Sequence, residues 1–513
     1  MRFVPAAAVA LPVLAAHAAP LAEPTCKDTD VLILGAGVAG LTAAQTFLDN
    51  GVNDFIVLEA RDESGGRLYS RDFAGHKIEV GANWVHGPGG PETGNINPIW
   101  TMVDNAKLDN VKTVNEDRVV FPKESRDAVQ AALEKAETAT GDVLIDAVDI
   151  LKKNHQDRSF RAGQRLKHWD PAKTDPAGQL ADWWAWDWEA ASPPEENSEV
   201  FGAISTIATY DYFSKGDYFV CDDHGYVSAL RNNVSDVLNK HADRVLFNHK
   251  VTDIKHNLDG VTVTSGGECF KAKYAIVTFS LGVLQRGKVN FDPPLPLWKR
   301  QSIAGFEIGT YTKIFLKFKS SFWDKKQFLL WADPHVRGNY PVFQPLEVTE
   351  AYKDSHILVA TVTGERSYRV ESQTDEETKQ ELLEVLKHMY GDKVSELEEI
   401  YYPRWTTEDW SYGSYSYWPP STSLQEHQNL RANVDSVFFA GEATSQEFFG
   451  YLHGAYYEGK HVAEFLARCI RGGQQECKQT NYEVLTGVTP YDLYNPDNGW
   501  YIYNETLGVP GHN

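Results

Sequence analysis

The feature that most constrains this chain is an apolar segment that leads through a glycine-rich turn into a predicted helix. Residues 30–34 form the apolar segment, and Gly35, Gly37 and Gly40 follow it in a Gly-x-Gly-x-x-Gly pattern. Such glycines permit a tight turn and bring the backbone close to a pyrophosphate, whose charge then lies at the N-terminus of the helix. A lone pattern of this kind can also be a chance turn.

A second predicted strand strengthens this signal. Residues 55–58 are apolar, and Glu59 follows them directly. In dinucleotide-binding units a carboxylate at this point accepts hydrogen bonds from a ribose. The two strands, the turn and the acidic residue together predict a dinucleotide site, with NAD and FAD as the two alternatives.

The composition is that of an acidic globular protein. The chain has 513 residues, of which 42% are hydrophobic, and 49 Lys and Arg stand against 71 Asp and Glu, a net charge of −22. This length allows two or three domains with a buried core, which excludes disorder and a disulfide miniprotein. The negative charge disfavours nucleic acid and anionic membranes as partners, and it would concentrate small cations near the protein.

The first residues predict export. An apolar run over residues 3–16 ends at Ala16-His17-Ala18, a small-x-small pattern that suits signal peptidase. The run is too short to span a membrane, and no other stretch approaches that length. We therefore expect a signal peptide over residues 1–18 and a secreted, soluble protein. The sequons at Asn233 and Asn504 are candidate glycosylation sites, although such triplets also occur by chance.

The five cysteines predict one structural disulfide and no metal site. Cys469 and Cys477 lie close enough in sequence to pair across a glycine-containing turn. Cys26, Cys221 and Cys269 show no metal-ligand spacing.

The segment after Glu59 indicates which dinucleotide is bound. Residues 59–68, Glu-Ala-Arg-Asp-Glu-Ser-Gly-Gly-Arg-Leu, resemble the extended fingerprint of FAD-dependent amine oxidases. Four later blocks resemble that family in the same order: residues 81–87, 311–315, 439–445 and 450–455. The match covers nearly the whole chain. Within the family, the sequence is most similar to the secreted polyamine oxidases of plants and fungi.

The resemblance implies an α/β two-domain fold of the p-hydroxybenzoate-hydroxylase and amine-oxidase type. A Rossmann-like FAD-binding domain is interleaved with a substrate domain built on a mixed sheet flanked by helices. The patterning agrees, because residues 273–279 and 308–318 have strand patterns and residues 375–389 have helical apolar spacing. We expect the FAD-binding domain in residues 27–112, 222–298 and 420–480, the substrate domain in 113–221 and 299–419, and a C-terminal tail in 481–513.

The resemblance also assigns residues to the cofactor. Gly35, Gly37 and Gly40 would approach the pyrophosphate, and Glu59 would accept from the adenosine ribose. Arg67 would counter phosphate charge. Residues 412–419 lack the cysteine through which monoamine oxidases attach flavin, so we expect noncovalent FAD.

Two further cofactor positions carry open alternatives. Glu442 would lie near the ribityl and pyrophosphate groups, where a carboxylate needs a helix terminus or water to offset its charge. Its alternative role is a helix cap. Val251 matches a position whose backbone contacts adenine in related enzymes, but it also fits an ordinary strand valine.

Lys313 is the most informative single residue. In family members the matching lysine holds a water against flavin N5, and this water would assist reoxidation or imine hydrolysis. The alternating pattern puts Tyr311, Lys313 and Phe315 on one face of a strand. The ordinary alternative is a solvated strand lysine.

Aromatic residues predict the substrate channel. Tyr415 and Tyr451 match the pair that flanks the amine, and Tyr311 matches a channel-lining position. A slot between aromatic faces guides an unbranched chain and favours a cationic amine. Glu189, together with Asp187, would supply distal anionic contacts. The cluster Trp183, Trp184, Trp186 and Trp188 fits core packing or channel wall, and we expect packing for most of it.

His86 departs from the plant pattern. Plant extracellular polyamine oxidases carry a glutamate there, whereas animal acetylpolyamine oxidases resemble this chain. A histidine titrates near neutral pH and hydrogen-bonds an amine or an acetamide, so the substrate and the oxidised carbon stay open. His86 could instead be a buried histidine bonded to a loop carbonyl. With Lys313, Tyr311, Tyr415 and Tyr451 it completes the predicted catalytic set.

These residues imply a secreted FAD-dependent polyamine oxidase. A secondary amine of spermine, spermidine or an N-acetylated polyamine would lose a hydride to flavin. The imine would hydrolyse to an aminoaldehyde and an amine, and oxygen would become hydrogen peroxide. We expect a monomer without nucleic-acid or membrane partners.

Three other functions fit parts of the same pattern. The first is a monoamine or L-amino-acid oxidase, although no carboxylate-binding arginine is identified. The second is a catalytically silent protein that binds FAD or polyamines, which retention of Lys313, Tyr415 and Tyr451 disfavours. The third is a lysine-specific histone demethylase, which the secretory start and the lack of an inserted coiled-coil hairpin disfavour.

Overall fold

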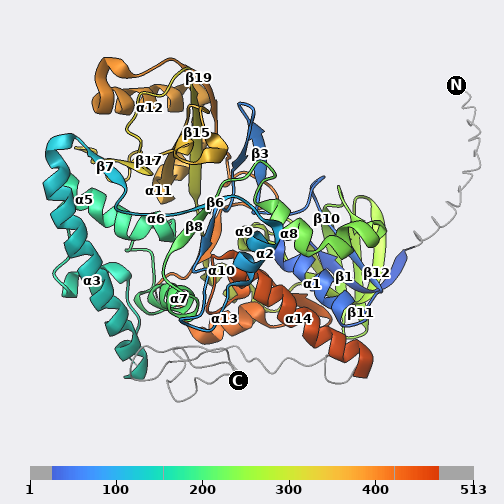
Figure 1. Ribbon diagram of the computed structural model, residues 1–513. Coiled ribbons are helices and arrows are strands. Elements are labelled where there is room, and N and C mark those ends of the chain that lie inside the picture. Colours follow the sequence, from blue (N-terminus) through green and yellow to red (C-terminus); the bar gives the residue numbers. More distant parts are fainter. Residues whose placement is uncertain (1–25, 154, 421, 473–513) are drawn as a thin grey trace, which may run out of the picture.

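The computed structural model describes residues 26–153, 155–420 and 422–472, and two large sheets organise this part of the chain (Figure 1). The eight-stranded sheet has the order β13-β10-β11-β12-β1-β2-β9, and β21 also pairs with β12. Strands β21, β12, β1, β2 and β9 run parallel where they pair, while β11 is antiparallel to its neighbours. The strands are β1 (Lys27–Leu34), β2 (Phe55–Leu58), β9 (Val245–Leu246), β10 (Val251–Asn257), β11 (Gly260–Ser265), β12 (Glu268–Val277), β13 (Asn290–Asp292) and β21 (Val437–Phe439).

Strand β1 lies at the centre of this sheet because its apolar run is buried on both faces. Val31 and Ile33 pack into one core with helix α1 (Val38–Asp49) and helix α14 (Leu452–Gly472). Leu32 and Leu34 pack into a second core on the opposite face. Continuous burial of this kind is typical of parallel strands covered by helices on both sides. Because β1 is anchored on both faces, the glycine turn that follows Leu34 has a fixed position.

The six-stranded sheet has the order β19-β15-β18-β17-β16-β7. On β15, Ile314, Leu316 and Phe318 pack against helix α12 (Asp375–Tyr390), whereas Phe315 packs on the opposite face. The predicted alternation over residues 308–318 spans two strands, β14 and β15, which belong to different sheets and meet at Thr310. The strands are β7 (Arg118–Phe121), β15 (Tyr311–Phe318), β16 (Phe328–Trp331), β17 (Val342–Pro345), β18 (Ile357–Thr363) and β19 (Leu397–Tyr401).

Three small sheets lie between the large ones. In the first, β5 (Trp84–His86) pairs with β8 (Asp217–Val220), which also pairs with β6 (Asn110–Lys112). This pairing sets His86 directly opposite Asp217. The other two are antiparallel pairs: β14 (Glu307–Gly309) with β20 (Tyr415–Tyr417), and β3 (Ser70–Phe73) with β4 (His76–Glu79).

Helices cover the sheets and close the space between them. In Figure 1, α3 forms the outer edge of the half that contains the six-stranded sheet, and α14 runs beside α1. A π-helical turn over Trp183–Asp187 lies between α5 and α6. The further helices are α2 (Pro98–Ala106), α3 (Arg126–Lys152), α4 (Phe160–Leu166), α5 (Pro176–Asp182), α6 (Trp188–Ala190), α7 (Glu199–Tyr212), α8 (Val227–Asn233), α9 (Leu281–Gln285), α10 (Leu297–Gly305), α11 (Gly364–Ser372) and α13 (Leu424–Arg431).

The chain passes repeatedly between the two halves. Strands of the eight-stranded sheet come from residues 27–58, 245–292 and 437–439, and those of the six-stranded sheet from 118–121, 311–363 and 397–401. The domain boundaries given above stay predictions. The predicted signal peptide and the tail over residues 481–513 lie outside the described residues, as does Asn504.

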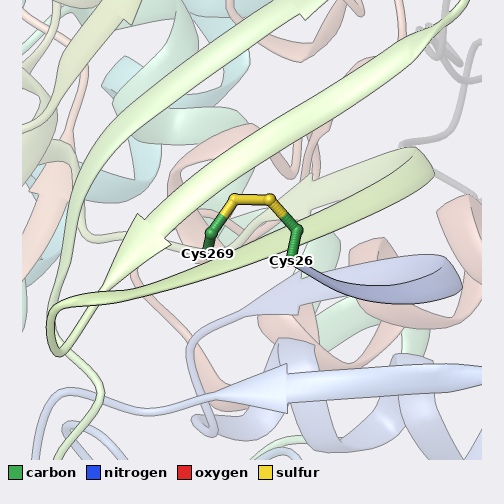
Figure 2. Close-up of a disulfide and its surroundings, with 2 residues drawn as sticks. All are labelled: Cys26 and Cys269. Atoms are coloured by element: carbon green, nitrogen blue, oxygen red, sulfur yellow. A yellow bond between two sulfur atoms is a disulfide. The ribbon is translucent and has the colours of Figure 1, made fainter. Parts of the chain in front are cut away.

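A disulfide joins Cys26, just before β1, to Cys269 in β12 (Figure 2). The sequence did not predict this pair, because 243 residues separate the two cysteines and only the parallel pairing of β1 with β12 brings them together. The predicted partner of Cys469, Cys477, lies outside the described residues, so that pair stays a prediction. Cys221 is a buried free thiol.

Neither a metal-ligand cluster nor a membrane-spanning helix occurs among the described residues. No group of His, Cys, Asp or Glu in this part of the chain has an arrangement that would hold a metal ion. None of the described helices combines the length and apolar character needed to cross a membrane.

Candidate active site

A cavity of about 1000 Å³ extends from the glycine turn after β1 to the aromatic residues beside β15. Its walls come from both large sheets and from the small sheets between them. Of the predicted site residues, Gly40 does not line the cavity. Those that do are Gly35, Gly37, Glu59, Arg67, His86, Glu189, Val251, Tyr311, Lys313, Tyr415, Glu442 and Tyr451.

The glycine turn leaves room for a pyrophosphate group beside the protein backbone. Gly35 has a φ of +119°, which only glycine adopts without strain, and a Cβ there would lie 2.5 Å from Thr278 Oγ1. A Cβ on Gly37 would meet nothing closer than 3.9 Å, so this residue faces open space at the start of α1. A Cβ on Gly40 would lie 1.9 Å from the carbonyl oxygen of Gly35. Gly35 and Gly40 therefore permit close packing of the turn, while Gly37 forms its open side.

Glu59 lies at the end of β2 on the cavity wall. Its carboxylate accepts hydrogen bonds from the backbone N–H groups of Ala36 (2.7 Å) and Arg61 (2.9 Å). Burial raises the pKa of Glu59, although both N–H groups oppose that shift. Each carboxylate oxygen has two lone pairs, so this residue can still accept from a ribose hydroxyl. Val251, the first residue of β10, lies in the same cavity.

Arg67 and Glu442 form an ion pair inside the cavity. Arg67 Nη1 donates to Glu442 Oε1 at 2.7 Å and to the carbonyl oxygen of Ser414 at 2.9 Å. Glu442 Oε2 accepts from the backbone N–H of Ser416 and of Gly450, at 3.2 and 2.8 Å. The carboxylate is thus balanced by a side-chain cation, which sequence reasoning had not paired with it. Neither a helix terminus nor water is needed for that balance.

Lys313 is buried and directed at the segment after β4. Its Nζ donates to the carbonyl oxygen of Glu79, to that of Gly81 (2.7 Å) and to Asn83 Oδ1 (3.0 Å). Its exposed fraction is 3%, which excludes a solvated strand lysine. Burial lowers the pKa of Lys313 to about 7, against the opposing charge of Glu79. An amine near its pKa at neutral pH can exchange a proton with water.

His86 lies in a cluster of carboxylates and phenols. Its Nδ1 is 3.0 Å from Asp217 Oδ1, 3.1 Å from the Tyr210 hydroxyl and 3.7 Å from Glu189 Oε1. Burial by itself would lower the pKa of His86, but the charges of Glu189 and Asp217 raise it to about 9. The side chain of His86 therefore bonds to acidic partners instead of the loop carbonyl considered above.

Glu189 connects the aromatic walls. The Tyr451 hydroxyl donates to Glu189 Oε1 at 2.7 Å, and the Tyr415 hydroxyl donates to the Glu189 carbonyl oxygen at 2.8 Å. The rings of Tyr311 and Tyr415 lie 6.2 Å apart, and those of His86 and Tyr451 lie 5.2 Å apart. The result is a carboxylate at the end of an aromatic slot.

The remaining predicted residues divide between wall and core. Trp184, Trp186 and Trp188 line the cavity, while Trp183 is buried and donates to Thr363 Oγ1 at 3.0 Å. The prediction that most of the four pack in the core is confirmed, because Trp183, Trp184 and Trp186 are buried in hydrophobic clusters, although the last two also contribute to the wall. Asp187 does not line the cavity, because Arg337 holds both of its oxygens at 2.7 Å.

Sequence reasoning missed four residues of the site: Glu79, Asn83, Tyr210 and Asp217. Asn83 lies inside a block that resembled the family, so its place in the motif was an available signal. Asp217 and Tyr210 carried no local signal. Their position depends on the pairing of β5 with β8 and on the docking of α7.

Comparison with known proteins agrees with this site. The sequence profile of the flavin-containing amine oxidoreductase family matches residues 38–466. The chain is 36% identical to Polyamine oxidase 1 of Zea mays, over 87% of this chain and 92% of that one. It is 35% identical to Polyamine oxidase 6 of Oryza sativa subsp. japonica, over the same shares of the two chains.

A solved structure of putrescine oxidase with bound putrescine has a TM-score of 0.67 to this chain, covering 86% of it and 99% of that structure, at 20% identity. This likeness concerns the fold, and it confirms the predicted mixed α/β two-domain architecture. The open side of the glycine turn, the position of Glu59 on the cavity wall and the size of the cavity fit FAD. The chain belongs to the flavin-containing amine oxidoreductase family and is an amine oxidase that binds FAD noncovalently.

Proposed function

We propose that this enzyme is a secreted polyamine oxidase acting on a secondary amine of spermine, spermidine or an N-acetylated polyamine. The observation that carries the proposal is the position of Glu189, whose carboxylate lies in an aromatic slot and accepts from Tyr451 at 2.7 Å. A carboxylate there attracts an ammonium group, and flat aromatic walls suit an unbranched carbon chain. The polyamine oxidases of maize and rice among the relatives point to the same substrate class.

The chain's own residues would position the reaction. Tyr311 and Tyr415 would flank the carbon chain, and Glu189 would hold a distal ammonium, so that a neutral secondary amine lies toward Lys313. When bound, FAD would supply the two-electron oxidation of that amine, with oxygen as the final electron acceptor. Lys313, with its pKa near 7, would hold or move a proton of the water that attacks the imine.

The charged residues of the cavity argue against an amino-acid oxidase. Arginine is the residue best shaped to bind the carboxylate of an amino-acid substrate, because its planar fork matches the two carboxylate oxygens. Among the described residues that line the cavity, Arg67 is the one arginine, and Glu442 already engages it. Lys313 argues against a silent binding protein, because an amine whose pKa lies at about 7 on the wall of a large cavity is typical of a catalytic site.

Secretion is the second part of the proposal. The Cys26–Cys269 disulfide supports it, because disulfides persist mainly in oxidising compartments. The sequon residue Asn233 is exposed at the end of α8, where a glycan would have room. Expression in a eukaryotic host tests this: we expect protein in the medium whose mass falls on treatment with an N-glycosidase. Full retention inside the cell would contradict secretion.

Anaerobic titration of the purified holoenzyme tests the reaction. Spermine, spermidine or N1-acetylspermine should bleach the oxidised flavin spectrum, and admitting air should yield an aminoaldehyde, an amine and hydrogen peroxide. Mass analysis of the products then identifies the oxidised carbon. Bleaching by benzylamine or L-leucine but by none of the polyamines would reassign the substrate. A spectrum unchanged by every amine would favour a binding protein.

A further inference from the structure

We propose that Asp217 is a positioning residue for substrate recognition: it holds His86 as an imidazolium through Nδ1, so that Glu189 remains the uncompensated carboxylate that takes one ammonium group. The proposal rests on the proposed function, since it specifies how the same site recognises an ammonium group of a polyamine. Asp217 does not belong to the residues predicted from the sequence, and it acts on the substrate through His86.

The contact between Asp217 and His86 is built into the fold. The two residues are direct partners on the antiparallel strands β8 and β5, and Asp217 Oδ1 lies 3.0 Å from His86 Nδ1. Asn97 Nδ2 donates to the His86 carbonyl oxygen at 2.8 Å, which fixes the backbone beside the ring. A hydrogen bond at Nδ1 decides which ring nitrogen faces the substrate. No described residue forms a hydrogen bond with Nε2, so Nε2 is the nitrogen left for a ligand.

Tyr210 fixes the position of the Asp217 carboxylate beside His86. Its hydroxyl donates to Asp217 Oδ1 at 3.0 Å and lies 3.1 Å from His86 Nδ1. The same hydroxyl is 3.5 Å from Glu189 Oε1, which the Tyr451 hydroxyl holds at 2.7 Å. Both carboxylates are therefore held in place by phenols from other elements, and Asp217 is the nearer of the two to the imidazole.

The charges around His86 sum to a single negative charge. The groups that face it are Glu189 from α6, Tyr210 from α7, Asp217 from β8, Tyr451 from the loop before α14, and His453 from α14. Burial, followed by the charge of His86, lowers the pKa of His453 well below its usual range, so His453 is neutral. Tyr210 and Tyr451 also stay neutral, because burial raises the pKa of each. One imidazolium and two carboxylates then attract one cation.

Replacing Asp217 changes this balance in a pH-dependent way. In Asp217→Asn, a protonated His86 would cancel Glu189, and the subsite would lose its attraction for ammonium. Raising the pH would deprotonate His86 and restore the negative charge of Glu189. Because the variant loses one of the two carboxylates that raise the pKa of His86, this restoration should occur below the wild-type value of about 9. Wild-type enzyme keeps His86 protonated over this range, so the recovery should appear as a rise in the ratio of variant to wild-type kcat/KM.

The experiment compares the kcat/KM of holoenzyme for spermine across this pH range. We expect Asp217→Asn to lose about tenfold near neutral pH, mainly through KM, and to recover as the pH rises. Asp217→Glu should keep the wild-type pH profile. Asp223→Asn removes the same charge from an exposed residue just after β8 and serves as the matched control. A loss by the same factor at every pH in Asp217→Asn would reduce Asp217 to a structural role and overturn the proposal.

A measurement without substrate separates this proposal from the proposed function. Because Glu189 and Asp217 raise the folded-state pKa of His86 above its ordinary value, the interactions of His86 with these two carboxylates stabilise the fold fully below about pH 6.5, and this stabilisation fades as the pH rises through about 9. The melting temperature of Asp217→Asn should therefore fall below that of wild type at low pH and converge with it at high pH. Parallel melting curves would refute the ion pair even if polyamines prove to be the wrong substrates.

Discussion

The Nζ atom of Lys313 donates a 3.0 Å hydrogen bond to Oδ1 of Asn83. Asn83 is itself held, because its Nδ2 donates to the carbonyl oxygen of Val220 at 2.9 Å. With the carbonyl oxygens of Glu79 and Gly81, three acceptors surround Nζ, which matches the three hydrogens of an ammonium group. A neutral amine has two hydrogens and a lone pair. Loss of one proton would therefore release an acceptor and offer the lone pair to water.

Replacing Lys313 should impair turnover without releasing the cofactor. Lys313→Met keeps an apolar chain of similar length but removes the group that can hold or move a proton. We expect kcat to fall about a hundredfold or more, in line with the loss of a general acid or base. Lys317→Met is the matched control, since Lys317 lies on the same face of β15 but outside the cavity. Steady-state kinetics with equal flavin content checks this, and unchanged kcat in Lys313→Met would contradict it.

The pH profile should respond to the partner of Lys313. Because its pKa lies at about 7, we expect an ionisation near that pH in the wild-type rate. Asn83→Asp would place a negative charge beside Nζ and favour the ammonium, so the apparent pKa should rise by about one unit or more. Asn83→Ser keeps a neutral acceptor and should not shift the pKa upward. A downward shift in Asn83→Asp would mean that Lys313 is not the titrating group.

The sequence predicts contacts best when the residues in contact lie close together in the chain. Gly35, Gly37 and Glu59 could be assigned because the turn, the strand and the carboxylate fall within one βαβ unit. Family blocks then located Lys313, Tyr415 and Tyr451, which the structure brings into the same cavity.

The contacts that the sequence did not predict are those between segments far apart in the chain. Asp217 meets His86 only because β5 pairs with β8 in one register, and a shift of one residue would separate them. Cys26 meets Cys269 for a similar reason. Asp187 has the pattern of an acidic residue beside the channel, but Arg337, 150 positions later, neutralises it. Charge alone in a sequence does not show which acids are already paired.

Breaking the pair of Arg67 and Glu442 should weaken both cofactor binding and stability. Arg67→Met would leave Glu442, which is 5% exposed, as an unpaired carboxylate on the cavity wall. We expect about 3–5 kcal/mol of destabilisation and loss of FAD during purification, because a buried charge without its partner is costly.

The double variant Arg67→Met/Glu442→Gln isolates this effect. It removes both charges, so it should recover part of the stability that Arg67→Met loses. Flavin content and melting temperature measure both variants. Equal losses in the single and double variants would show that the charge of Glu442 is not the cause.

Removing the Cys26–Cys269 disulfide should lower stability and leave catalysis intact. The bond closes a loop of 243 residues, so its loss frees the unfolded chain, and we expect Cys26→Ser/Cys269→Ser to lose about 2–5 kcal/mol. The bond lies at the start of β1, whereas the glycine turn follows its end; eight residues at about 3.3 Å each separate them by roughly 25 Å. Flavin content and kcat should therefore match wild type while the melting temperature falls.

Cys221→Ser, which changes a buried free thiol, is the control. A variant that melts like wild type would show that the pairing of β1 with β12 holds the two strands together without the bond.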